Sequence, residues 1–207
     1  MGVMIFDTPY IHVFKPGDLT KRPLLLLHGT GDDEHAMLDI AKAVAPDRSI
    51  ISPRGLVNEN GNLRFFRRFA EGHLDEDDVR FRSAQLSEFI LGAMAAYNFV
   101  TPIALGYSNG ANIALAMLYM QPEVLSGAVL LRSMAPFKHM PKVDLDQKPI
   151  LLLNGAQDQM IPRDASKQLI TTLESANAKL IHHTLPTGHG LSQTDITHTT
   201  HFLKEQN

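Results

Sequence analysis

The residues best suited to covalent chemistry lie in the segment 106–110, which reads GYSNG. Ser108 stands between an apolar run, residues 101–105, and a run of helical character, residues 111–120. A serine at a sharp strand-to-helix turn is held in a strained backbone region with its hydroxyl open to a substrate. Glycine on both sides avoids collisions with the neighbouring strand and helix. The pattern predicts a nucleophilic serine, and its simpler alternative is a serine that only caps the helix.

Two further residues with matching chemistry follow apolar or alternating stretches later in the chain. Asp158 comes after residues 150–153, and His189 stands between two glycines after residues 179–185. The carboxyl ends of parallel strands meet at one edge of an open sheet, so we expect Ser108, Asp158 and His189 to converge. An imidazole can take the proton of an attacking hydroxyl, and a carboxylate can fix the imidazole tautomer. The set predicts acyl transfer through a covalent serine intermediate.

The negative oxygen of such an intermediate needs backbone N–H donors. We expect one donor to be the amide of Asn109, directly after the serine and at a helix N-terminus. The other is the amide of Thr30, in the loop after the apolar run 24–27.

Other acids and bases in the chain are less favourably placed for this chemistry. Taken alone, Asp158 could cap a helix near Pro162, and His189 could be an ordinary loop residue. The rival acids lie in a connector or in predicted helices, and the rival bases in a predicted strand or in the last helix. These rivals are Asp144, Asp146, Asp164 and Asp195 as acids and His182, His183, His198 and His201 as bases.

His198 and His201 share one face of a predicted helix, which would suit a metal ion. The sequence has no helical His-Glu-x-x-His arrangement to support such a site. A solvated helix face is the favoured interpretation, and we expect no metal and no cofactor.

The elements that must position these groups alternate along the chain between short apolar runs and helical patterns. The predicted strands are residues 10–14, 24–27, 49–52, 101–107, 126–131, 150–153 and 179–185, and the predicted helices are 34–44, 83–98, 109–121, 163–176 and 191–204. Such alternation is typical of an α/β fold with a mostly parallel sheet and helices on both faces. We expect one domain over residues 1–207.

A polar loop is expected between the third strand and the second helix, over residues 55–82. It carries three arginines interleaved with three phenylalanines, at positions 64–69. The rings either pack onto the core or cover part of a substrate, and Phe65 is the candidate for the second role. Met134 and Met160 are further candidates for lining the same cleft, and each could equally belong to the core.

The composition excludes several classes of protein. The chain has 207 residues, 44% of them apolar and 20% charged, with a net charge of −3 and no cysteine. Disulfides and thiolate chemistry are excluded, and a cytoplasmic location is expected. The first residues lack the pattern of a signal peptide, and no apolar run approaches the roughly 18 residues of a membrane helix. The slight negative charge gives no reason to expect nucleic acid as a partner.

Together, four motifs resemble the α/β-hydrolase superfamily. They also resemble, within it, the phospholipase/carboxylesterase group that includes acyl-protein thioesterase-like enzymes. The motifs are residues 27–32 (LHGTGD), 106–111 (GYSNGA), 154–162 (NGAQDQMIP) and 188–190 (GHG). The resemblance implies a domain without a large cap that cleaves small carboxylic esters. The pattern resembles bacterial carboxylesterases of that group more than the thioesterases, including carboxylesterases linked to hydroquinone-type stress.

Two positions differ from those thioesterases, which commonly have leucine where this chain has Thr30 and Gln-Gly-Gly where it has residues 109–111. Both differences leave the backbone donors unchanged. Thioester or lysophospholipid hydrolysis by the same three residues remains an alternative, as does a non-catalytic protein that binds a small molecule. The expected partner is a small-molecule ester, and a homodimer is left open.

Overall fold

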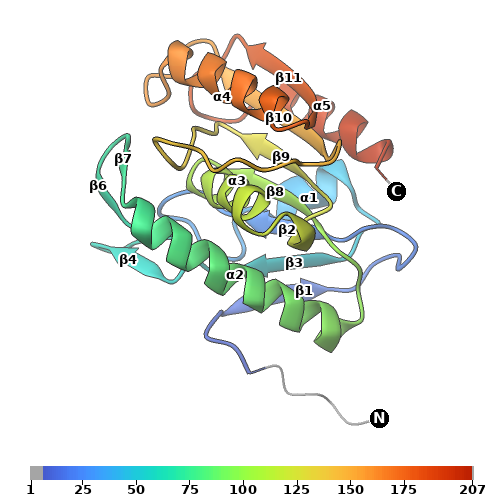
Figure 1. Ribbon diagram of the computed structural model, residues 1–207. Helices are drawn as coiled ribbons and strands as arrows, with labels where there is room; N and C mark the ends of the chain where they lie inside the picture. Colours follow the sequence, from blue (N-terminus) through green and yellow to red (C-terminus); the bar gives the residue numbers. More distant parts are fainter. Residues whose placement is uncertain (1–6, 207) are drawn as a thin grey trace.

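A seven-stranded sheet runs through the centre of the molecule (Figure 1). The computed structural model describes residues 7–206. The prediction that the chain does not begin with a signal peptide rests mainly on residues 1–6, which lie outside the described part. The strand order is β1-β3-β2-β8-β9-β10-β11, and only the β1–β3 pair is antiparallel. The strands are β1 (His12–Lys15), β2 (Leu24–Leu27), β3 (Ile50–Pro53), β8 (Ile103–Tyr107), β9 (Gly127–Leu131), β10 (Pro149–Gly155) and β11 (Lys179–Leu185). The predicted mostly parallel sheet is confirmed.

Helices cover both faces of this sheet because successive side chains of each strand point to opposite sides. Leu25 and Leu27 of β2 belong to the core under α2, α3 and α4, whereas Leu24 and Leu26 belong to the core under α1 and α5. The helices are α1 (Leu38–Val44), α2 (Glu76–Tyr97), α3 (Asn109–Met120), α4 (Arg163–Ser175) and α5 (Gln193–Lys204), with a short 3₁₀ turn at Pro122–Val124. Figure 1 shows α2, α3 and α4 on the near side of the sheet.

The segment 55–82, predicted as a loop, is mostly regular structure. It contains the hairpins β4 (Val57–Glu59) with β5 (Asn62–Arg64) and β6 (Arg68–Ala70) with β7 (His73–Leu74). Asn60 and Gly61 make the first turn with φ of 52° and 91°, a conformation that Asn and Gly tolerate.

Helix α2 begins seven residues earlier than the predicted start at residue 83. Asp75 is its N-cap, and the Asp75 carboxylate accepts a hydrogen bond from the Asp78 amide (3.2 Å). Glu76, Asp77 and Asp78 then occupy the first turn, where negative charge is favourable. The acidic run read as part of a loop is therefore a helix start.

Helix α1 is shorter than the predicted 34–44, because it starts at Leu38, and its N-cap Met37 makes no side-chain capping hydrogen bond. Asp33 instead accepts a hydrogen bond from the His35 amide (2.9 Å). The buried carboxylate of Glu34 binds the Arg54 guanidinium, with Nη2–Oε1 at 2.7 Å. This ion pair connects the turns at residues 34–37 to the residue that directly follows β3.

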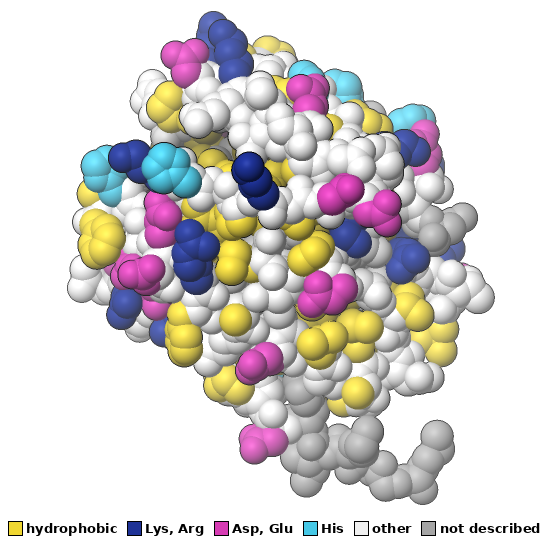
Figure 2. All heavy atoms as spheres, viewed as in Figure 1, with side chains coloured by type: hydrophobic (Ala, Val, Ile, Leu, Met, Phe, Trp, Pro, Cys, Tyr) yellow, Lys and Arg dark blue, Asp and Glu magenta, His cyan; other side chains and the backbone are white. Residues whose placement is uncertain are grey.

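The surface seen in Figure 2 mixes the two signs of charge, with Lys and Arg side chains interspersed among Asp and Glu. None of the helices in the described part of the chain combines the length and the apolar character that crossing a bilayer requires.

Candidate active site

Ser108 lies at the turn between β8 and α3, where its backbone has φ of 51° and ψ of −112°. This is a strained conformation for a residue with a side chain. The flanking glycines permit it. A Cβ on Gly106 would lie 2.6 Å from the carbonyl oxygen of Gly110, and a Cβ on Gly110 would lie 2.0 Å from that of Leu27. The strained turn and the steric reason for both glycines are as predicted.

His189 joins Ser108 to Asp158 through two hydrogen bonds. Its Nε2 lies 3.0 Å from Ser108 Oγ, and its Nδ1 lies 2.8 Å from Asp158 Oδ2. A carboxylate only accepts, so Nδ1 carries the proton and Nε2 is left to accept from the serine hydroxyl. The Asp158 side chain is 1% exposed and that of His189 is 19% exposed. The arrangement therefore gives the hydroxyl a base that a substrate can approach.

Asp158 is held by the turn in which it lies. Its Oδ1 accepts hydrogen bonds from the amides of Met160 (2.8 Å) and Ile161 (3.1 Å). Oδ2 is thereby left facing the imidazole of His189. The two oxygens have separate tasks, one fixing the turn and the other fixing the ring.

The loops that carry Asp158 and His189 pack closely because residue 155 is glycine. A Cβ there would lie 2.3 Å from the carbonyl oxygen of Gly188 and 2.5 Å from that of Thr187. On the other side of the His189 loop, the Tyr107 hydroxyl donates to the His189 carbonyl (3.2 Å). Strand β8 thus contacts both Ser108 and the loop that carries its hydrogen-bond partner.

The rival acids and bases lie elsewhere. Asp164 is on α4, and Asp195 on α5 is paired with a buried arginine, Arg132. His182 and His183 lie in β11, and His183 stacks on His198 of α5 with ring centroids 4.0 Å apart. No set of three or more metal-ligating side chains is assembled within residues 7–206.

The loop after β2 brings Thr30 beside Ser108 and Asn109 at one cavity. Within the described chain, neither the Thr30 amide nor the Asn109 amide donates to another residue. His28 braces this loop, since its Nδ1 donates to the Gly29 carbonyl (2.7 Å) and its Nε2 accepts from the Gly55 amide (2.9 Å). Burial lowers the pKa of His28, which keeps the ring neutral in this role.

Arg64 fixes the side chain of the same threonine. Its Nη1 donates to Thr30 Oγ1 (2.7 Å) and its Nε donates to the Phe66 carbonyl (3.1 Å). The Arg64 side chain is 4% exposed. The hairpin β4–β5 therefore supports the loop that carries one of the two free amides.

The cavity beside Ser108 has a volume of about 240 Å³. Met134 and Met160, both predicted to line it, do so. Phe65 does not, because it is 3% exposed and packs on the His28 ring with centroids 4.7 Å apart. Its place among the lining residues is taken by others. The remaining lining residues are Thr30, Arg64, Arg68, Glu71, Leu74, Tyr107, Ser108, Asn109, Asn112, Arg132, Ile161 and His189.

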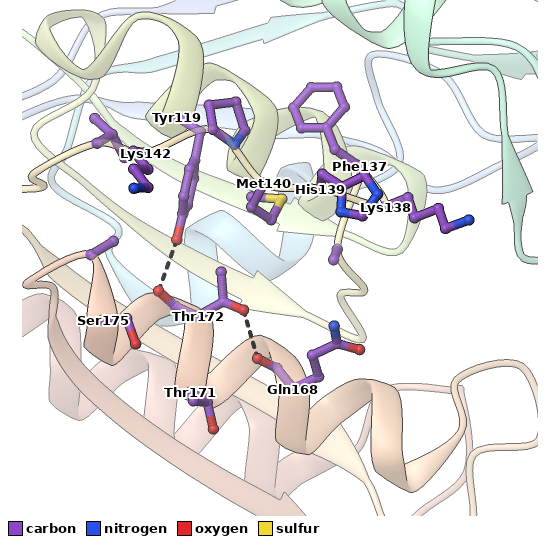
Figure 3. A pocket seen from close by; sticks show the side chains of 14 residues that line it. Tyr119, Phe137, Lys138, His139, Met140, Lys142, Gln168, Thr171, Thr172 and Ser175 are labelled. Carbon is purple, nitrogen blue, oxygen red and sulfur yellow. Dashed lines mark hydrogen bonds between the residues drawn. The ribbon is translucent and has the colours of Figure 1, made fainter.

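Two larger cavities continue from this one. The middle cavity, about 590 Å³, shares Leu74 and Met134 with the cavity at Ser108. The outer cavity, about 650 Å³, shares Phe137 and Gln168 with the middle one. Figure 3 shows the outer cavity between the end of α3, the connector that follows β9, and α4. The three cavities are therefore neighbours, in a row that begins at the serine.

Arg64, Arg68 and Arg132 line the cavity at Ser108 but were not predicted as residues of the site. Arg132 had a usable signal, because it directly follows the apolar run of β9 just as Ser108 follows β8. A charged residue at the carboxyl end of a buried parallel strand lies at the edge where ligands bind. The two arginines of the hairpins gave no such signal.

This fold and this hydrogen-bonded serine define the class of α/β hydrolases. The model of the phospholipase/carboxylesterase family matches residues 8–207. The putative hydrolase MhqD of Bacillus subtilis (strain 168) is 35% identical over 196 residues, which cover 94% of this chain and 98% of that protein. The chain therefore belongs to the phospholipase/carboxylesterase family, and it is an ester hydrolase.

Solved structures agree with this assignment. The carboxylesterase of Bacillus cereus is 40% identical, with a TM-score of 0.93 over 95% of this chain and 94% of that one. YahD, solved with malic acid, is 30% identical, with a TM-score of 0.90 over 96% of this chain and 100% of that one.

Proposed function

We propose that the chain hydrolyses small carboxylic esters through an acyl-serine intermediate. Ser108 attacks the ester carbonyl while His189 Nε2 takes its proton, and Asp158 holds the ring and stabilises its positive form. His189 then protonates the departing alkoxide and later activates the water that releases the acid. The amides of Thr30 and Asn109 hold the oxyanion. The 3.0 Å contact from His189 Nε2 to Ser108 Oγ carries this proposal.

Mutation of the serine tests the proposal, with p-nitrophenyl acetate as substrate and intact-protein mass spectrometry of acid-quenched samples. The wild type should show the added mass of one acyl group, and Ser108→Ala should show neither this adduct nor turnover. Ser126→Ala is a matched control. Ser126 directly precedes β9, and its hydroxyl donates to the Pro102 carbonyl (3.0 Å). An active Ser108→Ala enzyme with an unchanged melting temperature would contradict the mechanism.

The row of neighbouring cavities favours a second candidate, an ester or thioester with a longer acyl chain, such as a lysophospholipid. The cavity at Ser108 suits a short acyl group, whereas the adjoining cavities add space bordered by Leu74, Met134 and Phe137. A series of p-nitrophenyl esters from acetate to dodecanoate separates the two candidates. If the second candidate is correct, kcat/KM should rise with chain length. Gln168→Trp should then remove that rise, because Gln168 lines both the middle and the outer cavity and a larger side chain there would fill part of their space. Lys167→Trp, one residue away and lining none of these cavities, is the control.

Three expectations about the setting of the protein remain predictions. We expect a cytoplasmic enzyme that acts without a cofactor and does not bind nucleic acid. Whether the protein forms a homodimer is a fourth point. Sedimentation of the purified protein measures the last point directly.

A further inference from the structure

Arg132 is a buried arginine that takes no part in the mechanism proposed above. It follows β9 directly, its side chain is 0% exposed, and its backbone has φ of 55°, in the left-handed region that few residues other than glycine adopt. Its amide donates to the Leu153 carbonyl (2.8 Å) at the end of β10. Arg132 is therefore held between the strands that precede the Ser108 and Asp158 loops, and its backbone adopts a rarely populated conformation there.

The guanidinium of Arg132 donates to the His189 loop on both sides of the histidine. Nε donates to the Gly188 carbonyl (3.1 Å), and Nη2 donates to the Gly190 carbonyl (2.9 Å) and to Thr187 Oγ1 (3.1 Å). These acceptors are the two direct neighbours of His189 and the residue before them. Rotation or displacement of the histidine backbone would break one or more of these bonds.

Asp195 compensates the charge of this arginine. Its Oδ1 lies 2.8 Å from Arg132 Nη1, and its Oδ2 lies 2.9 Å from Nη2. Oδ2 also accepts from the Ser192 amide (2.8 Å) and hydroxyl (2.9 Å), which fixes the start of α5. Burial alone would raise the pKa of Asp195, but the bonds from Arg132 and Ser192 outweigh it and lower the pKa, so the carboxylate stays charged.

We infer that Arg132, with Asp195, is the positioning residue that fixes His189 for proton transfer. The inference depends on the function proposed above. Arg132 borders the cavity at Ser108, but its side chain has no exposed surface, so it acts through the loop and not by touching a substrate. Displacing a catalytic group by about 1 Å costs on the order of 10²-fold in rate. Removing the guanidinium should therefore lower kcat by about 10²-fold and leave KM within a few-fold.

The first test compares Arg132→Met and Arg132→Gly with Arg48→Met, using p-nitrophenyl acetate. Arg48 is also buried and donates to the Leu203 carbonyl (2.7 Å), away from Ser108, so its loss should leave kcat unchanged. Glycine tolerates the backbone conformation of residue 132, and the space it leaves should admit guanidinium ion. We expect added guanidinium to restore kcat of Arg132→Gly but not of Arg132→Met. A rise in KM with kcat unchanged would overturn the inference.

The second test is a double-mutant cycle. If Arg132 acts through His189, then Arg132→Met should have no further effect in a His189→Ala background, whose residual hydrolysis is still measurable. An equal fold-loss in both backgrounds would show that Arg132 supports the site in another way. Asp195→Asn, which preserves shape and removes the charge, serves if the Arg132 variants fail to fold, and it should lower kcat in the same His189-dependent way.

A third measurement does not depend on turnover. The proton on His189 Nδ1, hydrogen-bonded to Asp158, should give a low-field proton NMR signal that is lost in Arg132→Met and retained in Arg48→Met. Retention of the signal in Arg132→Met would contradict positioning while leaving the proposed function intact. Turnover by Ser108→Ala would instead contradict the proposed function.

Discussion

Replacing Asp158 by asparagine should nearly abolish activity while barely changing the fold. The carboxylate has two separate tasks in the structure. Its Oδ1 accepts from the amides of Met160 and Ile161, and its Oδ2 accepts from His189 Nδ1. An asparagine oxygen can serve the two amides only if its NH₂ group faces the imidazole. The imidazole must then accept at Nδ1 and carry its proton on Nε2.

In that tautomer His189 donates to Ser108 Oγ and cannot take its proton. The wrong tautomer in a comparable triad costs about 10⁴-fold in kcat. This corresponds to about 5 kcal/mol of transition-state stabilisation. The turn keeps both amide hydrogen bonds, so the free energy of unfolding should fall by only about 1 kcal/mol. The melting temperature of a chain of this size should then drop by roughly 2–4 °C.

The assay is kcat/KM for p-nitrophenyl acetate, together with thermal unfolding followed by circular dichroism. Asp164→Asn is the matched control, because this aspartate lies on α4 with a side chain that is 98% exposed. It should change neither quantity. An Asp158→Asn enzyme within tenfold of wild type would refute the reasoning, since Asp158 would then not govern the imidazole tautomer.

Two further predictions concern the loops around Ser108. Gly110→Ala places a Cβ 2.0 Å from the Leu27 carbonyl oxygen, so both kcat and the melting temperature should fall; an unchanged melting curve would contradict the steric argument. His28 has a pKa lowered by burial, so the unfolded chain binds its proton more readily. Its contribution to stability should be complete at neutral pH and decline as the pH falls below about 6.5. Urea unfolding at pH 7.5 and at pH 5.0 measures how much unfolding free energy is lost between the two pH values. This loss should be smaller in His28→Asn than in the wild type, and equal losses would contradict this assignment.

The sheet could be predicted from sequence because its strands carry their own signal. The four leucines of β2 are buried on both faces, so the run is continuously apolar. The residues at the ends of β8, β10 and β11 were predicted to converge for a topological reason. Parallel strands deliver their carboxyl ends to one edge, whatever the details of packing.

The predictions that were wrong concern features that depend on contacts between distant segments. Glu34 pairs with Arg54, which shortens α1, and no local pattern contains that pairing. Phe65 packs on His28, so a ring that resembled a substrate contact belongs to the core. The start of α2 was also predicted wrongly, but for another reason. Its acidic N-cap, Asp75, is a local feature that the sequence shows.

Arg132 shows most clearly what sequence alone does not supply. Its partners are Leu153, the loop 187–190 and Asp195, which lie 21 to 63 residues away along the chain. The convergence of Ser108, Asp158 and His189 was predictable, and so was the place of Arg132 at the end of β9. The contacts that Arg132 makes with the His189 loop and with Asp195 became visible only once the loops were assembled.

Reaction with a fluorophosphonate probe, followed by peptide mapping, shows directly whether Ser108 is the nucleophile. The probe reacts with a serine only when that hydroxyl has been made nucleophilic. If Ser108 is activated by His189 and Asp158 as proposed, we expect labelling at Ser108, much slower labelling in His189→Ala and Asp158→Asn, and unchanged labelling in Asp164→Asn. Labelling of the wild type at another residue, or equal rates in wild type and His189→Ala, would contradict it.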